Sequence, residues 1–257
     1  MMTDLQQRWF ILACICVVLA ITLALSSALS GLGTRWGWWG FRTGFVVLKW
    51  TAYAEVFMGL ISLIGCFFPA GGRSSQAFIL FLISFAIALA VVSVPLRMWL
   101  AVRALPMIHD ITTDTENPPQ FTAVIPMRKD AANPVVYGGR EVAEQQQKAY
   151  PYIRPLLVEA PPEKAFELAL ATARGMRWEI VSASPSEGLI EATDTTFWFG
   201  FKDDIVIRIS THDKGSRIDV RSLSRVGKSD VGANAERIRK FFRAWPAATP
   251  LADATHR

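Results

Sequence analysis

Cysteine is scarce in this sequence and confined to its first part. The three cysteines are Cys14, Cys16 and Cys66, and all of them lie within apolar stretches. None follows residue 100, so that region has neither a disulfide framework nor a cysteine-based zinc site. The cysteines therefore do not indicate whether the protein lies in an oxidising or a reducing compartment.

Histidines and catalytic motifs are also few. The three histidines, His109, His212 and His256, fall in a predicted connector, a turn and the C-terminal tail. Nothing in the pattern places them for a Ser-His-Asp triad. No P-loop, GxGxxG, HExxH or GxSxG motif occurs. We therefore expect no catalytic residue, no cofactor and no metal site, and an enzyme of unrecognised type remains only an alternative.

Charged residues make up 19% of the 257 residues and hydrophobic residues 51%, and the apolar ones are concentrated before residue 100. This distribution indicates membrane insertion. The net charge of +5 is typical of basic residues beside lipid headgroups. Because no nucleic-acid motif accompanies it, we expect the lipid bilayer as a partner and no nucleic acid.

Three apolar runs within residues 1–104 are each long enough to span a membrane as a helix. They cover residues 9–30, 45–68 and 77–99, with a turn at 69–72. A cleavable signal peptide is the competing interpretation of the first run, with a cleavage-like site at 28–30. We expect Pro95 to kink or end the third run. The tryptophans of the first loop are typical of the headgroup level: Trp36, Trp38 and Trp39.

Glu55 is the one acidic residue deep within the second run. An intramembrane carboxylate is costly and is by default a functional candidate. Two interpretations stay open: a hydrogen-bonded carboxyl that joins the helices, with Thr22 and Ser93 in reach, or a site that binds a proton or a partner. Lys49 lies about 240° away around the helix, so it does not face Glu55.

Residues 105–150 are predicted to be a connector. Asp110, Asp114 and Glu116 place carboxylates close together beside His109. The glycine pivot and the distal glutamate of a calcium loop are missing, so a hydrogen-bonded turn is favoured over a metal site. Residues 139–149 predict a short polar helix.

Residues 151–246 predict a soluble domain with the order α-β-β-β-β-α, followed by a disordered tail at 247–257. The helices are expected at 161–175 and from Ser229-Asp230 to Trp245. Alternating apolar residues indicate strands at 176–181, 189–195, 205–209 and 218–220. Hairpins join the strands, so we expect an antiparallel sheet with both helices on its apolar face, an α+β fold. A loop at 212–215 would place Arg208 opposite Asp219.

The block Ser224–Ile238, SRVGKSDVGANAERI, resembles the most specific part of the DUF1499 family. The resemblance covers about residues 106–245 and includes GFKDD at 200–204 and the lead-in at 109–119. It implies the fold, but the family has no known activity and so implies no catalytic residues.

The resemblance and the basic residues favour opposite sides of a bacterial inner (cell) membrane for the C-terminal domain. Relatives that are export-side lipoproteins or chloroplast proteins imply a periplasmic domain. The positive-inside rule favours the cytoplasm by four residues to two: Arg35, Arg42, Arg97 and Arg103 against Arg8 and Arg73. The side therefore stays open.

Candidate binding residues gather in and just before the DUF1499-like block: Asp203, Asp204, Arg221, Arg225, Lys228, Asp230 and Asn234. Asp203 and Asp204 could form an acid–base pair, but such a pair at a strand start more often meets nearby arginines, here Arg221 and Arg225. A helix start behind basic residues could bind an anion. Asp230 is a strong capping residue, however, so we expect its carboxylate to occupy that position.

Three functions remain. The first is a membrane-anchored accessory or binding module that meets a protein partner, and it predicts a filled core with a basic rim. The second is a carrier of lipid or another apolar ligand, which requires a contiguous apolar cavity. The third is the unrecognised enzyme, which requires titratable residues buried in a cleft.

Overall fold

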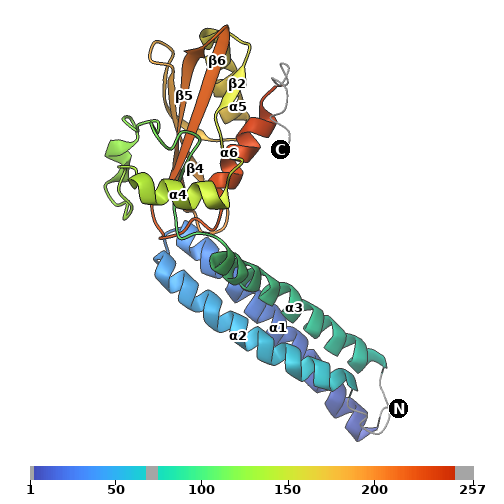
Figure 1. The fold of residues 1–257 in the computed structure, drawn as a ribbon. Coiled ribbons are helices and arrows are strands. Elements are labelled where there is room, and N and C mark those ends of the chain that lie inside the picture. Colours follow the sequence, from blue (N-terminus) through green and yellow to red (C-terminus); the bar gives the residue numbers. More distant parts are fainter. Residues whose placement is uncertain (1–2, 68–74, 247–257) are drawn as a thin grey trace. The chain divides into compact units, whose positions relative to one another are not determined.

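The computed structural model describes residues 3–67 and 75–246, and its contacts divide the chain into two compact units (Figure 1). The first unit comprises residues 1–100 together with 197–200. The second comprises residues 101–196 and 201–257. The predicted turn at 69–72 and the predicted tail lie outside the described residues.

The first unit is built from three helices, each long and apolar enough to cross a membrane, as predicted. They are α1 (Asp4–Arg35), α2 (Phe41–Phe67) and α3 (Ser75–Ala104). Pro95 does not end α3, which continues to Ala104. A proline ring removes one backbone donor, and the helix tolerates that loss here.

A short aromatic segment, residues 197–200, also belongs to the first unit. The indole Nε1 of Trp198 donates a hydrogen bond of 2.9 Å to the carbonyl oxygen of Ala28 in α1. Gly31 is required beside this ring, because a Cβ there would lie 2.4 Å from the indole. Gly200 has a φ of 68°, and a Cβ on it would lie 3.2 Å from the backbone of α1. Gly200 therefore marks a close approach of this segment to the backbone of α1.

The second unit contains an antiparallel sheet in the order β1-β6-β5-β4-β3, with β2 also paired to β6. The four long strands are β3 (Glu179–Ser184), β4 (Leu189–Thr195), β5 (Lys202–His212) and β6 (Gly215–Ser224). Two short strands, β1 (Asp110–Thr112) and β2 (Leu156–Val158), were not expected. β3 begins later than predicted because Met176 and Arg177 form the turn after α5, where Arg177 has a φ of 62°.

One face of the sheet carries both predicted helices, α5 (Pro162–Gly175) and α6 (Ala233–Ala244). Ile205 and Ile207 of β5 and Ile218 of β6 point into this core and are fully buried. Ile238 of α6 packs into the same cluster. The alternation that predicted the strands thus defines the face that receives the helices.

The opposite face of the sheet is covered by residues from the predicted connector. These residues include Phe121, Val124 and the 3-10 helix η1 (Ile125–Arg128). The predicted helix α4 (Gly139–Ala149) lies instead along the outer edge of β1, with Val142 and Ala149 packed against the helix-side core. Gln146 of α4 binds the backbone of Thr112 in β1 twice, accepting from its nitrogen at 2.9 Å and donating to its oxygen at 2.6 Å. The connector is therefore part of the same compact unit as the sheet.

The β5–β6 hairpin confirms the predicted pairing of Arg208 with Asp219. The turn is tighter than expected, because His212 already pairs with Gly215. The predicted four-residue loop and the observed tighter turn give the same strand register, because Arg208 is opposite Asp219 in both. The Arg208 Nη2 atom lies 2.9 Å from Oδ2 of Asp219 and 3.0 Å from Oδ2 of Asp114, and the Asp219 carboxylate is fully buried.

Candidate functional site

The predicted acidic pair divides between the two faces of the sheet. Successive side chains of a strand point in opposite directions. Asp204 faces the connector, whereas Asp203 faces α6, where it pairs with Arg237 at 2.5 Å. The interpretation of Asp203 and Asp204 as an acid–base pair is therefore wrong.

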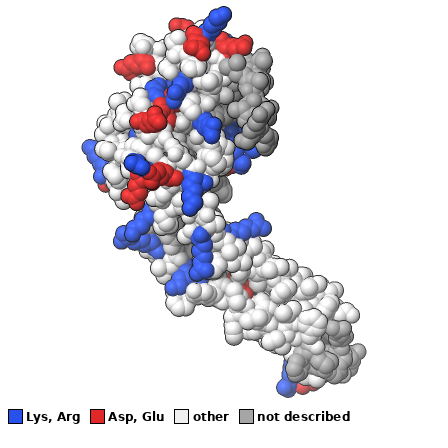
Figure 2. All heavy atoms as spheres, in the orientation of Figure 1, with Lys and Arg blue, Asp and Glu red and all other residues white. Residues whose placement is uncertain are grey.

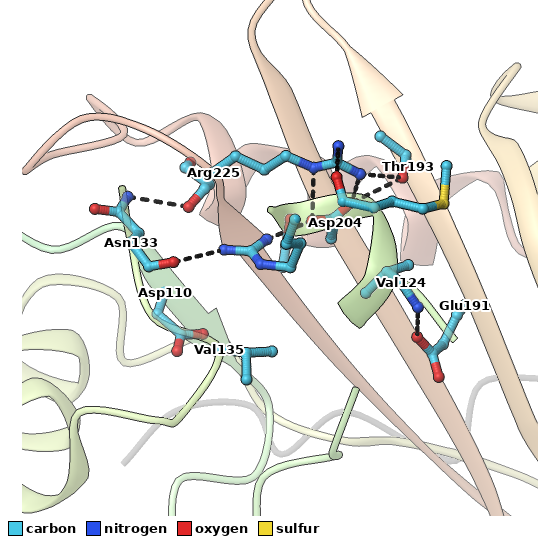
Figure 3. A network of polar contacts seen from close by, with 12 residues as sticks. Asp110, Val124, Asn133, Val135, Glu191, Thr193, Asp204 and Arg225 are labelled. Carbon is cyan, nitrogen blue, oxygen red and sulfur yellow. Dashed lines mark hydrogen bonds and ion pairs between the residues drawn. The ribbon is translucent and has the colours of Figure 1, made fainter. Parts of the chain in front are cut away.

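Asp204 is the centre of a buried ion network on the connector side (Figure 3). Its carboxylate accepts two hydrogen bonds from Arg225, at 2.9 Å from Nε and 2.7 Å from Nη2. The hydroxyl of Thr193 donates to it at 2.7 Å, and Arg128 forms a second, short ion pair. Asp204 is fully buried, and the two guanidinium groups compensate the negative charge that water cannot reach. The expected pairing of Arg225 with Asp204 is confirmed.

Arg221 does not pair with Asp203 or Asp204 as expected. Its guanidinium binds both carboxylate oxygens of Asp110, at 2.9 and 2.8 Å, and is fully buried. The aromatic rings of Phe121 and Tyr137 lie 5.0 and 5.5 Å from its central carbon. Asp110 comes from the connector, whose position on the sheet the sequence did not show. Arg221 is thus a core residue, and it does not contribute to the predicted basic rim.

The carboxylate of Asp114 forms the hydrogen-bonded turn that the sequence favoured over a metal site. Its Oδ1 accepts from the backbone nitrogens of Glu116 and Asn117, at 3.2 and 2.9 Å. Its Oδ2 pairs with Arg208 and Arg217, at 3.0 and 2.9 Å. Within residues 3–67 and 75–246, no group of three or more His, Cys, Asp or Glu residues is arranged to hold a metal ion.

Glu191 is a buried residue that the sequence reasoning missed. One carboxylate oxygen accepts from the nitrogen and hydroxyl of Thr122 and from the nitrogen of Ala123, at 2.6–2.9 Å. The other oxygen accepts from the nitrogen of Val124 at 2.9 Å. A glutamate between Ile190 and Ala192 in a predicted strand was the available signal. It anchors the chain just before η1.

On the helix side, Arg237 joins α6 to the sheet. It pairs with Asp194 at 2.9 Å as well as with Asp203, and it donates to Ser222 at 3.1 Å. Burial lowers the pKa of Arg237, but Asp203 and Asp194 more than compensate, so the net shift is upward. Arg237 lies off the apolar stripe from which the helix was predicted. A polar cluster at the end of the sheet instead draws it inward.

Asp230 precedes α6, which begins at Ala233 rather than at Ser229-Asp230 as predicted. Its carboxylate accepts from the backbone nitrogens of Gly232 and Asn234, at 2.9 and 2.8 Å. Burial raises its pKa, and the two backbone hydrogen bonds partly offset that shift. The start of α6 is therefore occupied by the protein's own carboxylate.

Two further predicted site residues differ sharply in accessibility. Asn234 is fully buried and donates to the carbonyl oxygen of His109 at 2.9 Å while accepting from Ser222 at 2.7 Å. Lys228 is exposed to solvent. Thus most of the predicted residues form a structural network, and Lys228 alone among those seven is exposed.

The residues of the ion network and of the layer that covers it lie within a segment that matches a known domain family. The family model described as "Protein of unknown function (DUF1499)" matches residues 110–244, a little more than half of the chain. The chain belongs to the DUF1499 family. The match begins at Asp110, so the DUF1499 domain includes the layer that supplies Asp110, Asp114 and Arg128. Comparison with curated proteins gave no significant match.

Glu55 lies in α2 and is fully buried. Thr22 and Ser93 do not reach it, because each hydroxyl donates to a carbonyl of its own helix, at 2.9 and 2.7 Å. Both carboxylate oxygens of Glu55 lack a hydrogen-bond partner among the described residues. The expected contacts with Thr22 and Ser93 were therefore wrong.

Proposed function

We propose that the protein is a membrane-anchored accessory or binding module whose soluble unit meets a protein partner. The observation that carries this proposal is the loop at residues 125–136. The buried ion network holds this loop from behind, and apolar side chains of the loop face solvent. A rigid loop with exposed apolar side chains is suited to binding another protein.

The network fixes the loop at several points along its length. Arg128 pairs with the buried Asp204. The side chain of Asn133 donates to the carbonyl oxygens of Ser224 and Gly227, at 3.0 and 2.9 Å. In return, arginines of β6 and the following turn donate to two loop carbonyls: Arg221 to Val135 at 2.7 Å and Arg225 to Met127 at 2.8 Å.

The same loop exposes three apolar side chains. Val136 is 74% exposed, Ile125 48% and Met127 42%. Charged residues of both signs are interspersed over the visible face of the second unit (Figure 2). Binding at a preorganised loop avoids the entropy cost of ordering it. We therefore assign the protein-binding surface to residues 125–136.

The two alternative functions have less support. A lipid carrier needs space between the sheet and its helices, where Ile205, Ile207 and Ile238 are fully buried in one cluster. An enzyme needs titratable groups that reach a substrate, but Asp204 and Arg221 are occupied by internal partners. These contacts favour a scaffold over a reaction centre.

A photo-crosslinker at position 136 of the full chain, activated in intact membranes, tests the proposal. We expect a crosslinked protein adduct that is lost when Ile125 and Met127 are both changed to Ser. The matched control is Tyr152→Ser, since Tyr152 is 57% exposed but lies outside the loop. Equal loss in the control, or an adduct with lipid alone, would contradict the proposal.

We also propose that the three helices cross the inner (cell) membrane of a bacterium, so that the termini lie on opposite sides. Their length and apolar character support three crossings. Reporter fusions after residues 40, 73 and 257 test this topology. We expect matching signals at 40 and 257 and the opposite signal at 73. The signal at 257 also distinguishes cytoplasm from periplasm.

A further inference from the structure

Glu55 is a buried titratable group that the proposed binding function does not use. Its side chain is fully buried in α2, and neither carboxylate oxygen has a hydrogen-bond partner among the described residues. The hydroxyls on the same face of the helix have other acceptors. Thr51 donates to Val47 and Leu48 at 3.0 Å each, and Ser62 donates to Ser84 at 2.9 Å. Glu55 is therefore not bound by the polar side chains of its own stripe.

No described cation compensates Glu55. Helix α1 has no charged residue between Arg8 and Arg35, and α3 has none before Arg97. The Nζ atom of Lys49 lies over the rings of Trp50 and Tyr53, at 5.6 and 6.0 Å. The other titratable groups in the apolar parts of the helices are Cys14, Cys16, Tyr53 and Cys66. None of these supplies a positive charge.

The charge state of Glu55 follows from this environment. An ionised carboxylate without a counter-charge or hydrogen bonds is very costly to bury, whereas the neutral acid costs far less. We propose that Glu55 is a proton-binding site within the helical unit, occupied at neutral pH. Release of the proton would leave an uncompensated negative charge inside the unit. The packing of α2 is thus linked to occupancy of this site by a proton.

Infrared spectra of the full chain in phosphatidylcholine vesicles at neutral pH test the proposal. The wild-type minus Glu55→Gln difference should contain the carbonyl band of one neutral carboxylic acid. The matched control is Glu144→Gln, since the Glu144 side chain is 61% exposed in its pair with Arg140. The control difference should instead contain the bands of an ionised carboxylate.

A second variant, Glu55→Asp, assigns the carbonyl band to residue 55 independently of Glu55→Gln. Glu55→Asp should keep the neutral-acid band but shift its frequency, because the acid remains in the same apolar surroundings. This result is informative even if Glu55→Gln does not fold. Ionised-carboxylate bands in the wild-type minus Glu55→Gln difference, or a neutral-acid band that Glu55→Asp does not shift, would overturn the proposal.

Discussion

The two units of this protein treat buried carboxylates in opposite ways. In the second unit, Asp110, Asp204 and Asp219 are buried against arginines, and Glu191 is buried against backbone N–H groups. In the first unit, Glu55 is equally buried but has no described partner. Burial alone therefore does not determine how a carboxyl group behaves in this chain.

The two units differ in the cations and hydrogen-bond donors that can stabilise a buried carboxylate. The DUF1499 domain brings a second layer over the sheet, and this layer supplies Arg128 and several free backbone donors. A membrane-spanning helix satisfies its own backbone and has none to spare. An ionised carboxylate is thus stabilised in the domain, whereas the helical unit favours the neutral acid. Replacing each carboxyl by its amide tests this contrast.

Asp204→Asn should have the largest effect. The change leaves Arg128 and Arg225 buried beside a neutral amide, and breaking a buried pair in this way costs about 3–5 kcal/mol. We expect a lower free energy of unfolding for the full chain in detergent, measured by hydrogen exchange in β5 and β6. The exposed pair of Arg140 and Glu144 is the control, where Glu144→Gln should cause no resolvable change. A decrease in the free energy of unfolding of less than about 1 kcal/mol for Asp204→Asn would contradict the contrast between the two units.

Glu191→Gln should have an intermediate effect. Its carboxylate accepts four hydrogen bonds, and an amide nitrogen in place of one oxygen would face an N–H donor. An unsatisfied buried group of this kind costs about 1–3 kcal/mol. We expect faster hydrogen exchange at Ala123 and Val124. Glu179→Gln on β3 is the control, because Glu179 is exposed. Unchanged exchange would show that the anchor is dispensable.

The strands and helices could be predicted because their patterns are local. The alternation of Ile205, Ile207 and Ile209 and the spacing of Ile238 and Phe242 depend on the period of a strand and of a helix. The register of Arg208 with Asp219 followed from the turn between them. These features require no knowledge of distant parts of the chain.

The candidate site was less predictable because its contacts join distant residues. Arg221 was recognised as a paired arginine, but its partner Asp110 lies 111 positions away in a segment predicted as a connector. Arg128 and Glu191 were missed for the same reason, since each contact joins the covering layer to a distant strand of the sheet. Arg237 was not among the predicted site residues, because helical periodicity does not reveal a buried polar cluster at a helix start.

Asp230→Ala should have a smaller effect at neutral pH, about 1 kcal/mol, as is usual for loss of a helix cap. Its pH dependence is more informative. Burial raises the pKa of Asp230, so the folded protein binds this proton more readily than the unfolded chain. The free energy of unfolding of the wild type relative to Asp230→Ala should therefore increase as the pH falls below neutral. Denaturant unfolding of both chains over a pH series measures this. A relative stability that increases with rising pH would show that Asp230 is stabilised as an anion.

Glu55→Gln should have the smallest effect and tests the comparison most directly. If Glu55 carries a proton, the change replaces one neutral group by another of similar volume. The free energy of unfolding in detergent at neutral pH should then change by less than about 0.5 kcal/mol. The same carboxyl-to-amide exchange at Asp204 is expected to be strongly destabilising. In alkaline solution the wild type should become less stable than Glu55→Gln, because its acid must ionise without a described counter-charge. A marked gain in stability of Glu55→Gln at neutral pH would mean that Glu55 is ionised in the folded protein, and the contrast between the two units would fail.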